Sequence, residues 1–174
     1  DNVAAAREAT AYVVAQGHER IGLICGTATS LLTKDREFGY RAAMRAARLD
    51  IADGWVVNGD LTLDGAISAT RSLLNHEHPP TAIFCTTDEM AFGCLHAIKT
   101  SGLRVPEDVS VMGFDDTRYA AVSDPPLTTI RQPAEEIGER VMYRMCREIE
   151  EGKSSVRGSN QPELVPHRLI VRQS

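Results

Sequence analysis

The sequence predicts an α/β domain in which a parallel sheet is flanked by helices on both faces, a Rossmann-like arrangement. Short runs of about five almost wholly apolar residues, such as 21–25 (IGLIC), are typical of strands that are covered on both faces. Amphipathic stretches with helical spacing separate these runs. Because the alternation recurs at least three times, right-handed βαβ crossovers and a parallel sheet are expected.

The first half of the predicted sheet comes from two helix-strand pairs. Helix 3–16 is predicted because its apolar residues recur on one face, and Gly17 is placed to end it. The unbroken apolar run 21–25 is the first strand. Helix 35–48 then leads to strand 55–57.

The second half repeats the pattern. Helix 63–74 has an apolar stripe and leads to strand 81–85, and helix 87–100 leads to strand 109–114. Gly102 and a following proline break the chain between the last two elements, as expected for a loop.

The pattern changes after residue 126. A short strand at 128–130 precedes helix 134–151, a polar, loop-like stretch covers 150–160, and 164–171 is extended. The last helix has an apolar stripe that another surface is expected to cover, formed by Ile137, Val141, Met145 and Ile149.

Composition excludes several classes of function. The chain has 174 residues and is 43% hydrophobic, which fits one domain or two small lobes. A formal net charge of −5 argues against direct nucleic-acid binding, and no apolar run is long enough to cross a membrane. The four cysteines contain no CxxC pair and are expected to be core thiols in a reducing compartment: Cys25, Cys85, Cys94 and Cys146.

Polar side chains follow each of the four predicted parallel strands. Ligands of open parallel sheets bind beyond the carboxyl ends of the strands, so these side chains are candidate ligand contacts. Carboxylates accept hydrogen bonds from hydroxyl groups and Arg offers a planar set of donors, which suits a sugar or a nucleoside. The candidates are Ser30 and Arg36, the segment 58–61, the segment 86–88, and the pair Asp115 and Asp116.

These residues also have purely structural interpretations. Thr86 and Glu89 have the spacing of a capping box, and Asp88 would lie in the first turn, where the helix dipole favours a negative charge. Arg36 could pair with a neighbouring carboxylate on a solvated helix face. Residues 115–116 could simply form a turn.

Common enzyme motifs are absent from the sequence. It contains no GxGxxG, GxxxxGK[ST], HExxH or GxSxG, and no nucleophile is paired with a base. We therefore expect a binding lobe without cofactor or metal, and not an enzyme, although an enzyme on the same scaffold is the third alternative. His76 and His78 are expected to lie in an exposed loop.

Phe92 suggests a subunit interface. It points away from the apolar stripe of helix 87–100 and should be exposed in a monomer. Tyr119 and Val122 are possible neighbours in the same surface. The alternative is a peripheral Phe92 that an adjacent loop covers.

Several longer blocks then follow one another in a specific order. They are GHERIG at 17–22, REFGY at 36–40, PTAIFC at 80–85 with DEMA at 88–91, GLRVPEDVS at 102–110, GFDD at 113–116 and DPPLTTI at 124–130 with Gln132 and Pro133. Together the blocks resemble the effector-binding core of LacI/GalR-type bacterial transcription regulators, over essentially the whole chain.

The resemblance implies a lobe similar to periplasmic binding proteins. Residues 1–130 would form the C-terminal lobe, 131–152 a helix that crosses to the N-terminal lobe, and 153–174 a loop and a return strand. The N-terminal helix-turn-helix and most of the N-terminal lobe would lie outside this chain. The implied protein is a cytoplasmic homodimer that binds operator DNA through that domain and responds to a sugar or nucleoside effector.

The resemblance also implies site residues, namely Ser30, Leu32, Arg36, Leu61, Thr87 and Asp115. Purine-binding members have Arg and Thr in place of Ser30 and Leu32, many members have an aromatic residue in place of Leu61, and sugar-responsive members commonly have Asn in place of Thr87. The family's dimer face would include Phe92 and the segment 118–123. The main alternative is a periplasmic sugar-binding protein for transport, against which the cysteines and the expected dimer face argue.

Overall fold

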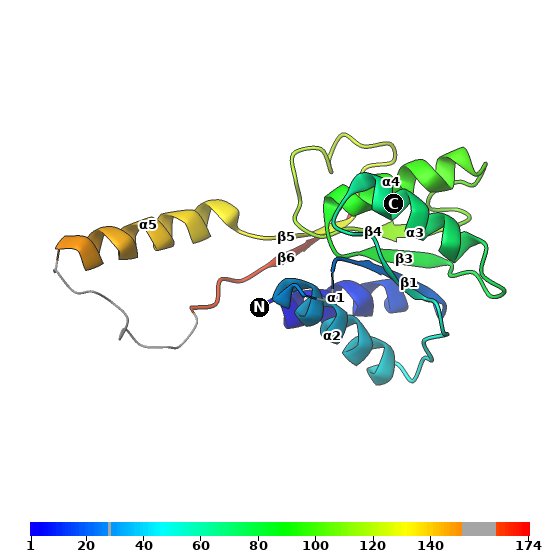
Figure 1. Ribbon diagram of the computed structural model, residues 1–174, viewed down its shortest axis with the longest axis horizontal. Coiled ribbons are helices and arrows are strands. Elements are labelled where there is room, and N and C mark those ends of the chain that lie inside the picture. Colours follow the sequence, from blue (N-terminus) through cyan, green and yellow to red (C-terminus); the bar gives the residue numbers. More distant parts are fainter. Residues whose placement is uncertain (28, 151–162) are drawn as a thin grey trace.

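The computed structural model describes residues 1–27, 29–150 and 163–174 (Figure 1). Its central sheet is parallel, with the strand order β2-β1-β3-β4. The strands are β1 (Ile21–Cys25), β2 (Val56–Asn58), β3 (Ala82–Cys85) and β4 (Ser110–Met112). In the register, Leu23 of β1 lies between Val56 and Phe84 of its two neighbours. The predicted α/β class and parallel sheet are confirmed.

Two pairs of helices cover the two faces of this sheet (Figure 1). They are α1 (Asn2–Ala15) with α2 (Leu31–Ala46), and α3 (Leu63–Leu74) with α4 (Asp88–Thr100). Ile21, Leu23 and Phe84 pack with the first pair, whereas Ile24 and Ile83 pack with the second. Because successive strand residues point to opposite faces, both cores require apolar residues, which explains the unbroken apolar strands.

The starts of α2 and α4 differ from the prediction because different residues cap them, and α1 begins one residue before its predicted start. Helix α2 begins at Leu31, four residues before the predicted start, and the Ser30 hydroxyl accepts a hydrogen bond from the Thr33 amide at 3.4 Å. Helix α4 is capped by Thr87, whose hydroxyl accepts from the Met90 amide at 3.2 Å. The predicted capping box that begins at Thr86 is therefore wrong by one residue.

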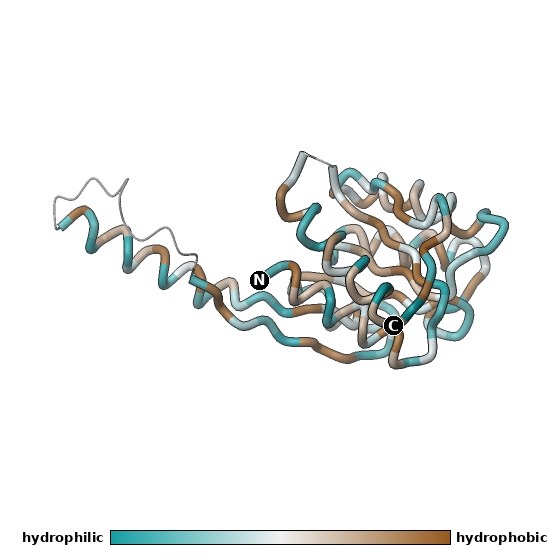
Figure 2. Tube along the Cα trace, turned by 90° about the horizontal axis from the view of Figure 1, so that it is seen from below, coloured by the Kyte–Doolittle hydropathy of each residue, from teal (hydrophilic) through white to brown (hydrophobic). Residues whose placement is uncertain are grey.

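Helix α5 (Ala134–Glu150) extends away from the body as an arm (Figure 1). Strand β5 (Thr129–Arg131), just before it, pairs antiparallel with β6 (Arg168–Ile170), the next strand along the chain. None of the residues of α5 is buried, and Ile149 is 76% exposed. The predicted apolar stripe thus has no cover within the described residues, and the trace of the arm alternates between hydrophobic and hydrophilic positions (Figure 2). The predicted loop-like stretch 150–160 lies, apart from residue 150, outside the described residues.

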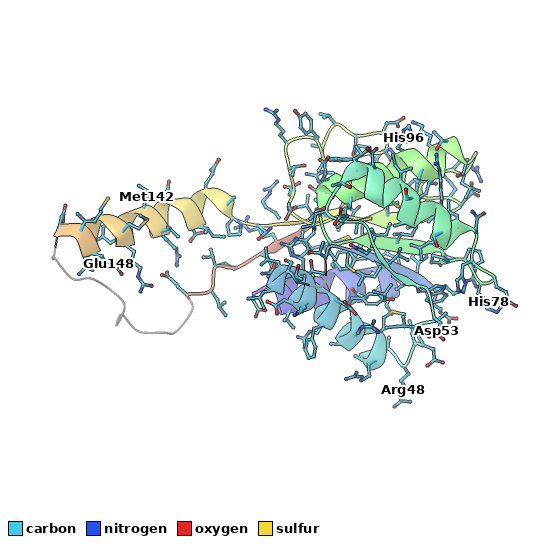
Figure 3. The ribbon with its side chains drawn as sticks, in the orientation of Figure 1. Arg48, Asp53, His78, His96, Met142 and Glu148 are labelled. Atoms are coloured by element: carbon cyan, nitrogen blue, oxygen red, sulfur yellow. The ribbon has the colours of Figure 1, made fainter. Side chains whose placement is uncertain are left out.

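The cysteine prediction holds for three of the four residues. Cys25, Cys85 and Cys94 are free and buried, but Cys146 is exposed because it lies on the α5 arm. The expected loop around His78 is exposed. It lies at the end of the body that is farthest from α5, the helix that carries Met142 and Glu148 (Figure 3). Over 1–27, 29–150 and 163–174, no helix is long and apolar enough to cross a membrane, and no three His, Cys, Asp or Glu side chains are grouped to hold a metal ion.

Candidate functional site

A pocket of about 260 Å³ lies at the carboxyl edge of the parallel sheet. All six residues predicted for the site line it: four come from segments that follow the four parallel strands, and two lie on α2. The structure adds Thr33 and Gln132 to this lining, together with Thr86 from the candidate segment 86–88. The full set is Ser30, Leu32, Thr33, Arg36, Leu61, Thr86, Thr87, Asp115 and Gln132.

Three helices begin beside this pocket because the strands are parallel. Each strand ends at the same edge, and the following helix starts there with a capped N-terminus. Ser30 caps α2, Thr62 caps α3 next to Leu61, and Thr87 caps α4. The polar residues that cap the helices therefore also line or border the pocket.

Arg36 is held rigidly in the wall of the pocket. Its side chain is buried, and its guanidinium lies 3.7 Å from the centre of the Phe114 ring. Its Nε donates to Asn2 Oδ1 at 3.0 Å, and Nη1 donates to the Thr86 carbonyl. Nη1 also lies 3.6 Å from Asp115 Oδ1. The alternative in which Arg36 pairs with a neighbouring carboxylate on a solvated helix face is therefore wrong.

Burial and nearby charges shift the pKa of Arg36 in opposite directions. Burial lowers the pKa of the Arg36 guanidinium, and the carboxylates of Asp115 and Asp88 oppose that shift. Because arginine starts from a very high pKa, it stays protonated at physiological pH. The pocket therefore holds a fixed cation that is compensated by acidic side chains.

Asp115 lies opposite this cation with its carboxylate partly open to the pocket. Gln132 Nε2 donates to Asp115 Oδ1 at 2.6 Å. Burial raises the pKa of Asp115 to about 6, Arg36 lowers it and Asp88 raises it. Asp115 also has a φ of +123°, a strained backbone conformation that is common at functional sites. Its carboxylate can accept hydrogen bonds from a hydroxylated ligand.

Asp116 has a different role from its neighbour. It bonds Arg131 at 2.5 Å and Arg172 at 2.7 Å, and its side chain is almost fully buried. It fastens the segment after β4 to β5 and to the C-terminal residues. Asp116 is thus structural through its ion pairs, whereas Asp115 faces the pocket, and neither residue lies in a turn, so the turn interpretation is wrong.

Asp88 is structural. It is fully buried, and its carboxylate accepts from the Thr129 hydroxyl at 2.6 Å and from the Thr117 amide at 2.7 Å. Its own amide donates to the Phe114 carbonyl at 2.7 Å. Burial raises the pKa of Asp88, and the two accepted hydrogen bonds oppose this shift. These bonds hold the segment that carries Asp115 against the start of α4.

Gln132 and Asn2 are site residues that sequence reasoning missed. The segment before Gln132 runs beside β4: the Gly113 amide donates to the Thr128 carbonyl and the Asp115 amide to the Ile130 carbonyl, both at 2.8 Å. Gln132 thus follows a fifth, strand-like segment at the same edge, and the rule that located the other residues would have found it. No comparable signal marks Asn2.

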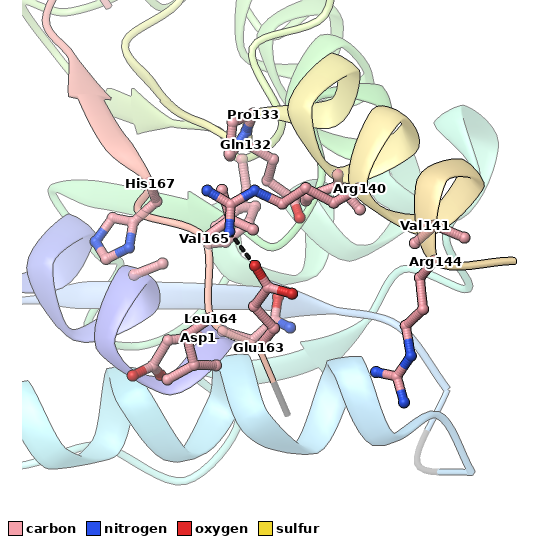
Figure 4. A pocket seen from close by; sticks show the side chains of 14 residues that line it. Asp1, Gln132, Pro133, Arg140, Val141, Arg144, Glu163, Leu164, Val165 and His167 are labelled. Carbon is pink, nitrogen blue, oxygen red and sulfur yellow. Dashed lines mark hydrogen bonds and ion pairs between the residues drawn. The ribbon is translucent and has the colours of Figure 1, made fainter. Parts of the chain in front are cut away.

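A larger pocket of about 340 Å³ lies at the base of the arm, between the start of α1, α5 and residues 163–167 (Figure 4). Arg140 reaches across it to Glu163, and Gln132 lines both this pocket and the smaller one. Through Gln132, the wall of the sheet-edge pocket is therefore also part of the pocket at the base of the arm.

The three predicted dimer residues differ in exposure. Tyr119 and Val122 are exposed, as expected. Phe92 is half-buried and packs against the core between α3 and α4, so its predicted exposure is wrong. The dimer face stays a prediction.

Comparison with known proteins agrees with this geometry. Residues 10–174 match the family described as "Periplasmic binding protein-like domain". The HTH-type transcriptional repressor CytR of Escherichia coli (strain K12) is 40% identical over the whole chain, which covers 50% of that protein. The ribose operon repressor of the same strain is 44% identical over 92% of this chain and 46% of its own length. The chain thus spans about half the length of the curated relatives it matches.

The fold also matches solved structures of regulators. The Lac repressor dimer bound to operator and the anti-inducer ONPF superimposes with a TM-score of 0.87 at 31% identity, over 99% of this chain and 58% of that one. These relatives are transcription regulators of the LacI family, and their similarity extends through every segment that lines the pocket. The chain belongs to the periplasmic-binding-protein-like domain family, within the effector-binding cores of LacI/GalR-type regulators.

Proposed function

We propose that this chain is the effector-sensing part of a DNA-binding transcription regulator, and that its sheet-edge pocket binds a small sugar or nucleoside. The observation that carries the proposal is the convergence of Arg36, Asp115 and Gln132 on one pocket from separate segments. The names of the relatives support a repressor and do not favour a periplasmic transport receptor or an enzyme. A cytoplasmic location is part of the same proposal.

Each side of the pocket has its own task. Arg36 would donate to ring or hydroxyl oxygens, and Asp115 would accept from hydroxyls or from a base N–H. Leu32 and Leu61, both about half exposed, would pack against an apolar face of the ligand. Ser30 and Thr87 would contribute hydroxyl groups at the rim, in addition to capping their helices.

The signal would leave the pocket through a change in lobe orientation. In this proposal residues 1–130 form one lobe, helix 131–152 crosses to an N-terminal lobe that covers its apolar stripe, and 153–174 returns to the first lobe. A ligand shifts the balance of two orientations only if it binds them with different affinity. Through a homodimer, that shift would change the spacing of two helix-turn-helix domains on the operator.

Operator binding in the full regulator tests the proposal directly. Fluorescence anisotropy with labelled operator, in the presence of pentoses, hexoses and nucleosides in turn, should identify one compound that changes operator affinity at least tenfold. The same compound should have no effect on the Asp115→Ala variant. A regulator whose operator affinity ignores every such compound would contradict the proposal.

Effector binding should weaken as the pH falls through 6. The carboxylate, which accepts hydrogen bonds, is the binding form of Asp115, and its pKa is raised to about 6. Between pH 7.5 and pH 5, titration calorimetry should therefore show an affinity loss of about tenfold. The Asp115→Asn variant should show no such dependence. A wild-type affinity that is constant over this range would contradict the assigned role.

Ionisation of Asp115 has the opposite effect on folding stability: it favours effector binding but opposes folding. A raised pKa in the folded state means that the ionised carboxylate opposes folding. This penalty is absent below the unfolded value of 3.8 and is fully present above about 6. Asp115 thus costs stability at neutral pH, as expected of a binding residue.

A charge at Tyr119 should weaken the proposed dimer. Tyr119→Glu places a carboxylate in the predicted interface, and sedimentation velocity of the full regulator should show a dimer dissociation constant raised at least tenfold. Phe38→Glu is the matched control, because Phe38 is also an exposed aromatic residue but lies on α2, on the other face of the sheet. Dimerisation that responds equally to both changes would contradict the assignment.

A further inference from the structure

The single cation of the sheet-edge pocket is already paired with acidic groups of the chain. Among the described residues that line the pocket, Arg36 is the only Lys or Arg side chain. Its Nη1 lies 3.6 Å from Asp115 Oδ1, and the carboxylate of Asp88 also acts on it electrostatically. A ligand that enters this pocket therefore meets a compensated positive charge.

Two of the three helix N-termini at the pocket, those of α3 and α4, are compensated too, whereas α2 has no acidic residue in its first turn. The N-terminus of a helix attracts anions because its first amides lack partners in the helix. At α4, however, Asp88 and Glu89 occupy the first turn, and the Asp88 amide donates to the Phe114 carbonyl. At α3, Asp64 lies in the first turn. The chain's own carboxylates thus offset the positive end of the helix dipole at these two helices.

The N–H groups of Arg36 that are not used within the protein suit a neutral hydrogen-bond acceptor on the ligand. Nε donates to Asn2 and Nη1 to the Thr86 carbonyl, and Nη2 has no hydrogen bond to any residue of the described chain. Because the neighbouring Nη1 lies 3.6 Å from Asp115 Oδ1, the N–H groups of Nη2 favour a hydroxylated ligand, which supplies both acceptors and donors. A phosphate group supplies acceptors and negative charge, which the adjacent Asp115 would repel.

We propose that this pocket selects an uncharged hydroxylated ligand over the phosphorylated form of the same compound, and that Asp115 sets this selectivity. The inference rests on the proposed sensing function and adds to it the charge of the ligand. Repulsion between a carboxylate and a phosphate several ångströms apart at a protein surface corresponds to a loss of about 10- to 100-fold in affinity. Replacing Asp115 with asparagine removes that repulsion and exposes the charge of Arg36.

The test is titration calorimetry on the full regulator with ribose, glucose, adenosine and uridine, each compared with its monophosphate. The wild type should bind one neutral compound about 10- to 100-fold tighter than its phosphate. In Asp115→Asn the ratio should fall below about threefold, because neutral binding weakens and phosphate binding improves. Asparagine tolerates the positive φ at this position.

Asp60→Asn is the matched control. Asp60 is exposed next to Leu61, also has a positive φ, and does not line the pocket. This variant should keep the wild-type ratio, which separates local repulsion from overall charge. A wild type that binds a phosphate as tightly as the neutral compound would overturn the selectivity and leave the sensing function standing. An unchanged ratio in Asp115→Asn would overturn the role of Asp115. Binding of none of the eight compounds would overturn the proposed function, and the selectivity with it.

Discussion

Replacing Arg36 with lysine is expected to reduce effector affinity about a hundredfold while the protein stays folded. Lysine keeps the charge but not the planar set of donors that bonds Asn2 and the Thr86 carbonyl while it stacks on Phe114. Without those contacts the cation is no longer aligned with Asp115 or the ligand. Titration calorimetry with the effector gives the affinity, and far-UV circular dichroism checks the fold.

Arg41→Lys is the matched control for this change. Arg41 lies on the same helix, but it is exposed and bonds Glu37 on the surface at 2.7 Å. Its replacement should leave effector affinity within about twofold. If Arg36→Lys binds the effector as tightly as Arg41→Lys does, Arg36 is not a ligand contact.

Replacing Asp88 with alanine is expected to lower the stability of the fold substantially. The change leaves the Thr129 hydroxyl and the Thr117 amide without the buried carboxylate that accepts from both. The loss of two buried, charge-assisted hydrogen bonds corresponds to about 3 kcal/mol of the free energy of unfolding. Chemical denaturation monitored by circular dichroism measures this loss, and the urea midpoint should fall while the slope of the transition stays constant.

Two further variants define the origin of the effect. Asp88→Asn retains one acceptor oxygen and should lose less stability than Asp88→Ala. Asp35→Ala removes an exposed carboxylate from α2 and should leave the midpoint almost unchanged. A midpoint for Asp88→Ala equal to that of Asp35→Ala would show that the Asp88 bonds do not hold the segment of Asp115.

Most of the fold could be predicted because strands covered on both faces leave a strong signal. The run 21–25 is apolar throughout, since its alternate residues enter two different cores. Element boundaries were less accurate because they depend on single capping side chains. Ser30 starts α2 four residues early, and Thr87 caps α4 in place of the adjacent threonine.

Site residues that follow the ends of strands could be predicted from the sequence. Site residues that depend on tertiary contacts were missed. Arg36 and Asp115 face the same pocket, as the carboxyl-edge rule and the family resemblance both expected. Asn2 meets Arg36 only because α1 and α2 pack together, a contact that no local pattern reveals. The partial burial of Phe92 has the same origin, since Phe92 packs against a core that several distant segments of the chain form.

A thermal-shift panel on the full regulator tests whether the effector binds in the pocket of Arg36 and Asp115. Pentoses, hexoses, nucleosides and purine bases are added in turn to the wild type and to Asp115→Ala. One neutral, hydroxylated compound should raise the melting temperature of the wild type and leave that of the variant unchanged, because ligand binding stabilises only a folded, intact site. A compound that stabilises both proteins equally would place the effector outside the pocket of Arg36 and Asp115 and contradict the account.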